Sequence, residues 1–101
     1  MNPNKLLQQL GSIQEQMRKA QAQLAQETIE LTSAGGAVKV VINGAQRLQS
    51  VEINPELLQT GDTELINDAL VAAINDAIER SQTLAAEKLG NLTGGLGLPG
   101  F

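Results

Sequence analysis

The first quarter of the chain carries apolar residues at intervals of four, three, four, three and four positions. They are Leu6, Leu10, Ile13, Met17, Ala20 and Leu24. This heptad spacing keeps one stripe of an α-helix facing a partner, and it predicts a helix that runs to about Gln26. The opposite face is rich in glutamine, so the helix has too little apolar surface to fold alone. Because the rest of the chain is short, we expect the partner to be a second copy of the protein. The predicted residues of this homodimer interface are Leu6, Leu10, Ile13, Met17 and Leu24.

The composition excludes several classes of chemistry. A chain of 101 residues is one domain, and its core must be aliphatic because Phe101 is the only aromatic residue. The absence of Trp and Tyr argues against an aromatic stacking platform for single-stranded nucleic acid. The absence of His and Cys excludes the usual zinc sites, thiolate nucleophiles and imidazole acid–base catalysis. We therefore expect a protein that is not an enzyme, with no cofactor, no metal and no small-molecule substrate.

Apolar runs are short throughout the sequence. The stretch that follows Met1 is polar and amphipathic, unlike the apolar region of a signal peptide. The longest apolar run is also too short to span a bilayer. We therefore expect a soluble cytoplasmic protein with no membrane partner.

Charge is distributed unevenly along the chain. The net charge of −4 argues against strong non-specific binding to nucleic acid. Residues 1–26 are nevertheless basic, with Lys5, Arg18 and Lys19 against Glu15, whereas residues 52–87 carry eight acidic residues against Arg80. Arg18 and Lys19 are predicted to point away from the apolar stripe. They are therefore either a solvated helix face or contacts to phosphate groups.

The hydrophobic period changes to two after the first helix. Alternation over 28–32 and 38–42 predicts two strands, joined by a tight turn at Gly35-Gly36. Asn43-Gly44 is a strong hairpin signal, and it predicts a third strand over 47–53. Leu48 is out of phase with Val51 and Ile53, which predicts a β-bulge in that third strand.

Helix signals return after the third strand. Asn54-Pro55 is typical of a helix start and predicts a short turn through Leu58, which Gly61 ends. Asp62 is a predicted cap for a last helix with a broad, alanine-rich apolar stripe. Gly90 is the predicted C-terminal stop of that helix.

The order of these elements defines the expected fold class. It is α+β, an α-β-β-β-α protomer in which a three-stranded antiparallel meander lies between two long helices. Residues 1–92 are the predicted single domain, and residues 93–101 a flexible, Gly-rich C-terminal tail. One long helix can cover the sheet; the other then keeps an exposed apolar stripe, which predicts association.

Several short motifs, in the order in which they occur, resemble those of the YbaB/EbfC family of bacterial nucleoid-associated proteins. They are Met17-Arg18-Lys19-Ala20-Gln21, Val38-Lys39-Val40, Asn43-Gly44, Val51-Glu52-Ile53-Asn54-Pro55-Glu56-Leu57-Leu58, Ala72-Ala73-Ile74-Asn75-Asp76-Ala77 and Glu87-Lys88-Leu89-Gly90-Asn91-Leu92-Thr93-Gly94-Gly95-Leu96-Gly97-Leu98-Pro99-Gly100. The resemblance covers nearly the whole chain.

The resemblance implies a tweezer-like homodimer that binds double-stranded DNA through its helical arms and acts in nucleoid organisation and gene regulation. Carried over by position, it gives Arg18, Lys19, Arg80 and Lys88 as DNA-binding residues, and Lys5 is added to them for its location near the tip of the helical arm. The sequence departs from the family pattern at Ala45-Gln46, where relatives often have a lysine. With few cations in each chain, we expect salt-sensitive contact with the DNA backbone rather than readout of sequence.

A second interpretation of the sequence is a protein–protein adaptor. In that case the acidic last helix and the Leu-Gly-Leu-Pro tail would engage another protein. Partners that survive nuclease treatment of a lysate would favour the adaptor over the DNA-binding protein.

Overall fold

The structure is a computed structural model that describes residues 3–94, and it places three strands between two long helices. The elements in chain order are α1 (Pro3–Gln26), β1 (Thr28–Ser33), β2 (Val38–Asn43), β3 (Leu48–Ile53), α2 (Pro55–Gln59) and α3 (Thr63–Gly94). The sheet is antiparallel in the order β1-β2-β3. The predicted α-β-β-β-α order and α+β class are confirmed.

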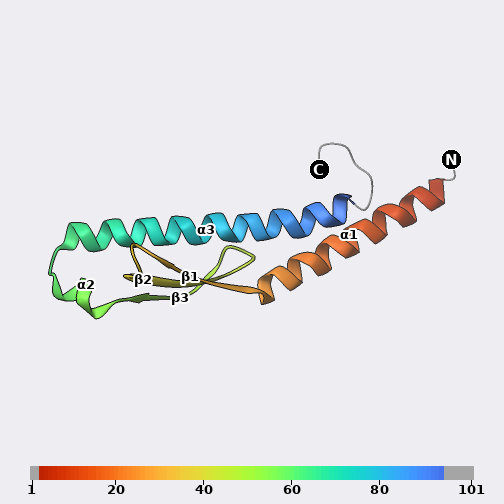
Figure 1. Cartoon of the computed structure of the whole chain (residues 1–101). Helices are drawn as coiled ribbons and strands as arrows, with labels where there is room; N and C mark the ends of the chain where they lie inside the picture. The colour runs from red at the N-terminus through yellow and green to blue at the C-terminus, as the bar shows by residue number, and fades with distance from the viewer. Residues whose placement is uncertain (1–2, 95–101) are drawn as a thin grey trace.

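The two long helices relate to the sheet in different ways. Helix α3 lies along one face of the sheet. Helix α1 adjoins the sheet only through its own C-terminal end, and its N-terminal part projects away from the sheet (Figure 1). We call residues 28–90 the body and residues 3–19 the arm. The molecule is therefore elongated, with extents of 68, 24 and 16 Å.

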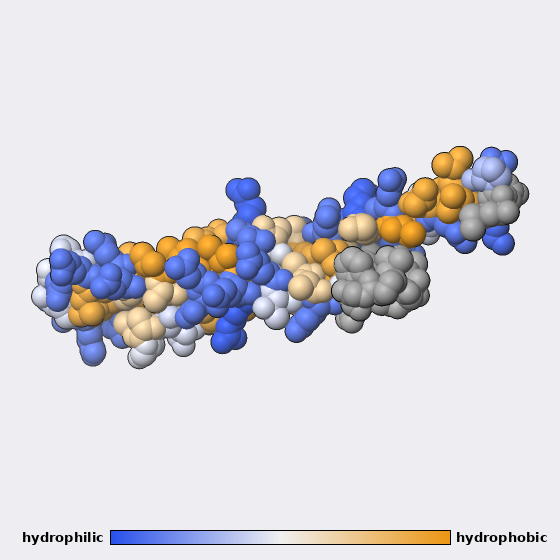
Figure 2. All heavy atoms as spheres, turned by 90° about the horizontal axis from the view of Figure 1, so that it is seen from above, coloured by the Kyte–Doolittle hydropathy of each residue, from blue (hydrophilic) through white to orange (hydrophobic). Residues whose placement is uncertain are grey.

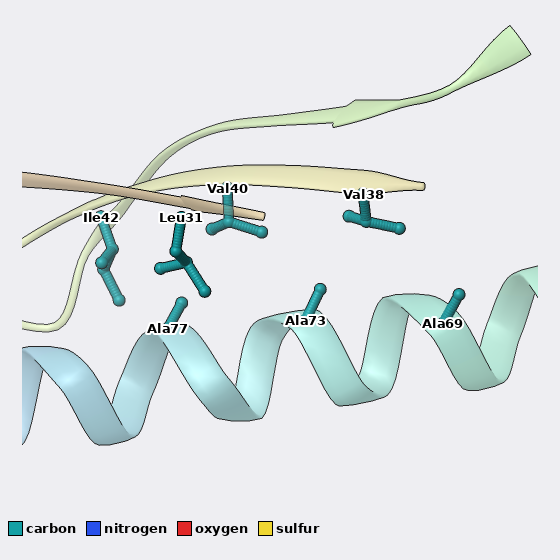
Figure 3. Close-up of a cluster of buried hydrophobic side chains, with 7 residues drawn as sticks. All are labelled: Leu31, Val38, Val40, Ile42, Ala69, Ala73 and Ala77. Carbon is teal, nitrogen blue, oxygen red and sulfur yellow. The ribbon is translucent and has the colours of Figure 1, made fainter. Parts of the chain in front are cut away.

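The core lies between the sheet and α3. Strand β2 buries every second side chain, Val38, Val40 and Ile42, as its period-two pattern requires. Figure 3 shows these residues and Leu31 of β1 facing an alanine stripe on α3. That stripe is Ala69, Ala73 and Ala77. Alanine at four-residue spacing lets the helix lie close to the sheet, so a small chain gains a well-packed aliphatic core.

Helix α3 packs over β1 and β2 rather than over β3. The pairing register puts Leu48 opposite Ile42 and Val51 opposite Val40, on the face of the sheet that is turned toward α3. Both β3 side chains remain exposed, at 43% and 37%, whereas Ile42 and Val40 are fully buried. One strand of the sheet therefore presents an apolar inner face that the helices of the described region, residues 3–94, leave exposed.

The predicted irregularity in the third strand is present. Val41 pairs with Ser50 and Ile42 pairs with Leu48, so Gln49 is the extra residue of a bulge in β3. The strand itself begins at Leu48, one residue later than predicted.

Both predicted hairpins form. In the first loop Ala34, Gly35 and Gly36 all adopt a positive φ, as a Gly-Gly pair allows. In the second loop the left-handed residue is Gln46, with φ of 63°, and Gly44 does not have a positive φ. Gln46 N–H donates to the carbonyl of Asn43, and Asn43 N–H donates to the carbonyl of Arg47. Residues 44–47 form the loop between β2 and β3.

Helix α2 begins as predicted and ends at Gln59, one residue later than predicted. The side chain of Asn54 accepts a hydrogen bond from Glu56 N–H at 2.9 Å, and Gly61 ends the turn with φ of 65°. The carboxylate of Asp62 accepts from Leu65 N–H at 3.1 Å, which confirms the predicted cap of α3.

The predicted stop at Gly90 is wrong, because α3 continues to Gly94. A single glycine in a helix costs only about 1 kcal/mol relative to alanine, which a helix of this length tolerates. The proposed tail therefore overlaps the helix at residues 93–94, and its remainder lies outside the described residues.

Candidate functional site

Within the described residues, the arm carries exposed leucines on its apolar stripe. Leu6 and Leu10 are 42% and 48% exposed, and Leu7 beside them is 65% exposed. Ile13 and Met17, nearer the body, are half-buried. Figure 2 shows hydrophobic atoms along the arm as well as along one edge of the body. This part of the predicted seam is therefore available to a partner.

Leu24 has a different place from the rest of the seam. It is 3% exposed and lies against Gly44 in the turn between β2 and β3. Ala20, one turn earlier, is also buried. The last two turns of α1 thus pack on the chain's own body, and the seam of the arm consists of the exposed Leu6 and Leu10 with the half-buried Ile13 and Met17.

The arm also carries three of the predicted DNA-binding residues, Lys5, Arg18 and Lys19, and all three are exposed. Arg18 is engaged by Glu15 one turn earlier: its Nη2 and Nε donate to the carboxylate at 2.6 and 3.1 Å. This hydrogen bonding lowers the pKa of Glu15 and raises the pKa of Arg18. Among the described residues, no ion pair holds Lys5 or Lys19.

Arg80 lies on the body, on an exposed turn of α3. It lines a shallow hollow between α3 and β1 together with Glu79 and Glu87. Two carboxylates near one guanidinium make this position less attractive to a phosphate than the arm is.

Lys88 lies near the point where α1 meets β1. Its ammonium Nζ donates to Oε1 of Glu27 at 2.5 Å, and the two side chains are 25% and 43% exposed. The fold thus pairs a predicted DNA-binding cation with a carboxylate 61 positions earlier in the chain. Neither residue signals this pairing in the sequence.

Two further cations were not among the predicted DNA-binding residues. Lys39, on the outer face of the sheet, pairs with Glu30 at 2.9 Å, and the hydrogen bond raises the pKa of Lys39. Arg47 is exposed in the turn between β2 and β3. Gly44, the first residue of this turn, contacts the end of α1. The sequence signal that could have identified Arg47 is its place as a basic residue just after the Asn43-Gly44 turn.

Two other kinds of site are absent from the described part of the chain. Among residues 3–94, no three carboxylates gather in a way that would hold a metal ion. None of the helices in that range combines the length and the apolar character needed to cross a bilayer.

Together these features define a class of protein: a small α+β body from which one amphipathic helix projects, with leucines along one stripe of that helix and exposed cations outside the stripe. Comparison with known proteins identifies the family. The YbaB/EbfC DNA-binding family model matches residues 1–96. The chain belongs to this family.

Curated relatives agree with this assignment. The chain is 40% identical over 100 residues to a nucleoid-associated protein of Pelotomaculum thermopropionicum, covering 99% of this chain and 95% of the relative. It is 44% identical over 96 residues to a nucleoid-associated protein of Chloroflexus aurantiacus, covering 95% and 96%. These similarities support a nucleoid-associated DNA-binding protein, as the sequence motifs indicated.

The fold is also found in a crystal structure. The uncharacterized protein HP0035 from Helicobacter pylori aligns with a TM-score of 0.70 at 22% identity, covering 95% of this chain and 97% of that chain. At this level of identity the likeness concerns the fold alone.

Proposed function

We propose that this protein binds duplex DNA as a homodimer, through phosphate contacts made by Lys5, Arg18 and Lys19 of the arm. The observation that carries the proposal is the projection of α1 from the body, with its cations exposed. A helix that stands clear of an acidic body can approach a polyanion without bringing the carboxylates of α3 close to it.

The spacing of the arm cations suits a DNA backbone. Lys5 and Lys19 are fourteen residues apart, which is about 21 Å along a helix, or about six base pairs of duplex. At about 100° per residue, Lys19 lies on the side of α1 opposite Leu10 and Met17, whereas Arg18 lies about 80–100° from these two residues, at the flank of the apolar stripe. The leucine stripe can therefore contact a protein surface while the cations contact DNA.

Two uncovered apolar surfaces support the homodimer. One is the exposed seam of the arm, and the other is the inner face of β3 with Leu48 and Val51. Exposed aliphatic side chains on this scale are typical of a surface that associates. A second copy would cover both surfaces and would double the number of arm cations that act on one duplex.

The contacts are proposed to be with the backbone and not with bases. Lysine and arginine on an exposed helix provide charge, which positions a protein on DNA without selecting a sequence. Arg80 and Lys88 remain proposed secondary contacts by position in the family pattern, although carboxylates lie beside both. The proposed role is a non-catalytic one, in nucleoid organisation and gene regulation, at the nucleoid.

A gel-retardation assay with duplex DNA tests the role of the arm. The test variant is Arg18→Gln with Lys19→Gln, which removes two positive charges. The matched control is Ala72→Glu with Asn75→Glu, which changes net charge equally at exposed positions of α3. We expect the arm variant to lose retardation at salt concentrations where wild type and control still bind. Equal loss in both variants would mean that net charge alone matters, and retained binding by the arm variant would remove these residues from the interface.

A further inference from the structure

The corner between β2 and β3 lies unusually close to the end of α1. A Cβ atom built on Gly44 would be 2.8 Å from both the backbone oxygen and a side-chain methyl carbon of Leu24. Such distances are shorter than carbon atoms tolerate, so only glycine fits at this position. Since Gly44 does not have a positive φ, the glycine is required by the close approach of Leu24 and not by the turn.

Hydrogen bonds join this corner to the end of α1. Gly44 N–H donates to the carbonyls of Leu24, at 2.9 Å, and of Glu27, at 3.0 Å. The side-chain amide of Asn43 donates to the carbonyl of Ala25 at 3.2 Å. The carbonyls at a helix end have no partner within the helix, and here the body supplies partners for them.

The same corner is fixed to α3 on its other side. The hydroxyl of Ser81, which is fully buried, donates to the carbonyl of Asn43 at 2.8 Å and accepts from Gln46 N–H at 3.0 Å. The carboxamide oxygen of Asn43 accepts from Ala45 N–H and Arg47 N–H, which holds the turn closed. The ion pair between Lys88 and Glu27 links α3 directly to the residue that follows α1.

We propose that these residues form a socket that sets the direction in which the arm leaves the body, and that Lys88 acts as a positioning residue of the arm. The socket consists of Leu24, Glu27, Asn43, Gly44, Ser81 and Lys88. The proposal rests on the proposed function, since it matters for DNA only if the arm binds DNA. In a homodimer, the separation of the two sets of arm cations would follow from the direction that the socket imposes.

The length of the arm makes its direction sensitive to small changes at the socket. Residue 8 is sixteen positions before Leu24, which is about 24 Å along the helix, so a tilt of about 10° moves it by about 4 Å. A shift of that size changes which phosphates the cations can reach.

The direction of the arm can be measured without DNA. The chain has no native cysteine, so spin labels at Gln8→Cys and Asn75→Cys, both exposed positions, report the distance from arm to body. Mixing with excess unlabelled protein leaves most dimers with only one labelled chain, so the measured distance is the one between the two labels of that chain. We expect Gly44→Ala to shift this distance by roughly 4 Å or to broaden its distribution to a similar extent.

Gly11→Ala is the matched control, since Gly11 lies within the arm and a Cβ there meets nothing within 4 Å. We expect it to leave the distance unchanged. An unchanged distance in a folded Gly44→Ala variant would overturn the socket. Because this measurement contains no DNA, it fails or succeeds independently of the proposed function.

Lys88 gives a second test, which remains available if Gly44→Ala does not fold. If Lys88 acted through direct DNA contact alone, the two substitutions would have opposite signs: Lys88→Gln would weaken duplex binding, and Glu27→Gln would strengthen it by removing a negative charge. The socket predicts the same sign for both, because either substitution breaks the link and broadens the arm-to-body distance. We expect both variants to broaden that distance and both to weaken duplex binding severalfold. Opposite effects on binding, with unchanged distances, would overturn the positioning role.

Discussion

The guanidinium of Arg18 and the carboxylate of Glu15 form a two-point contact on the arm, at 2.6 and 3.1 Å across one helical turn. Both side chains are at least half exposed, so solvent and DNA can reach them. A phosphate that binds Arg18 must therefore compete with Glu15 for the same donors. If the arm binds DNA as proposed, Glu15 is expected to reduce its affinity without removing any cation.

Removal of Glu15 should strengthen DNA binding. In Glu15→Gln the guanidinium of Arg18 loses its ionic partner, and the arm loses its one negative charge. We expect severalfold tighter binding to duplex DNA at low salt, measured by fluorescence anisotropy. Asp68→Asn removes the same charge from an exposed position on α3 and should have a smaller effect. Equal effects of the two substitutions would show that Arg18 makes no specific contact.

Acidification should remove this difference between wild type and Glu15→Gln. The pKa of Glu15 lies below its ordinary value of 4.5, chiefly because Arg18 donates hydrogen bonds to the carboxylate. The pair is thus fully formed above the ordinary pKa and is lost as the pH falls through the lowered value. Other carboxylates titrate in both proteins, so the ratio of the two affinities isolates Glu15. We expect that ratio to fall toward one at acidic pH; a constant ratio would contradict the competition.

The alanine stripe of α3 should not tolerate larger side chains. Ala73 is fully buried between the helix and the sheet, where Figure 3 shows it facing β2. Ala73→Leu is expected to destabilise the protein by about 1–3 kcal/mol, because the helix must move away from Val38 and Val40. Ala72→Leu, at the neighbouring exposed position, should leave chemical unfolding almost unchanged. Similar midpoints for both variants would contradict the close packing.

Much of the fold could be predicted because its signals are local. The heptad spacing of α1, the period-two pattern of β2 and the cap at Asn54 each lie within a few residues of the structure they specify. The bulge at Gln49 was also predictable, since a phase slip between Leu48 and Val51 cannot fit a regular strand.

The parts that could not be predicted depend on contacts between distant residues. The pairing of Lys88 with Glu27 and the burial of Leu24 by Gly44 both follow from the place where α1 meets the body. The exposure of Leu48 and Val51 depends on how α3 crosses the sheet. Periodicity gives the face of an element that is apolar, but not how much of that face another element covers.

The uncovered apolar surfaces should make the protein a dimer in solution. Sedimentation equilibrium is expected to give about twice the 10.6 kDa of one chain. Leu10→Asp in the arm seam and Val51→Asp on the inner face of β3 should each weaken the dimer, because both place a carboxylate in a proposed contact. Leu58→Asp, at a 51% exposed position of α2, should not. Dimers of unchanged affinity in both test variants would exclude these surfaces.

The dependence of duplex affinity on salt measures phosphate contacts most directly. Lys5, Arg18 and Lys19 in two arms give six cations, so the slope of log affinity against log salt should be about −5 if each contacts a phosphate. Arg18→Gln with Lys19→Gln removes four of these contacts from a dimer and should reduce the slope by about 3.6. A slope that is the same in wild type and in this variant would contradict DNA binding by the arm.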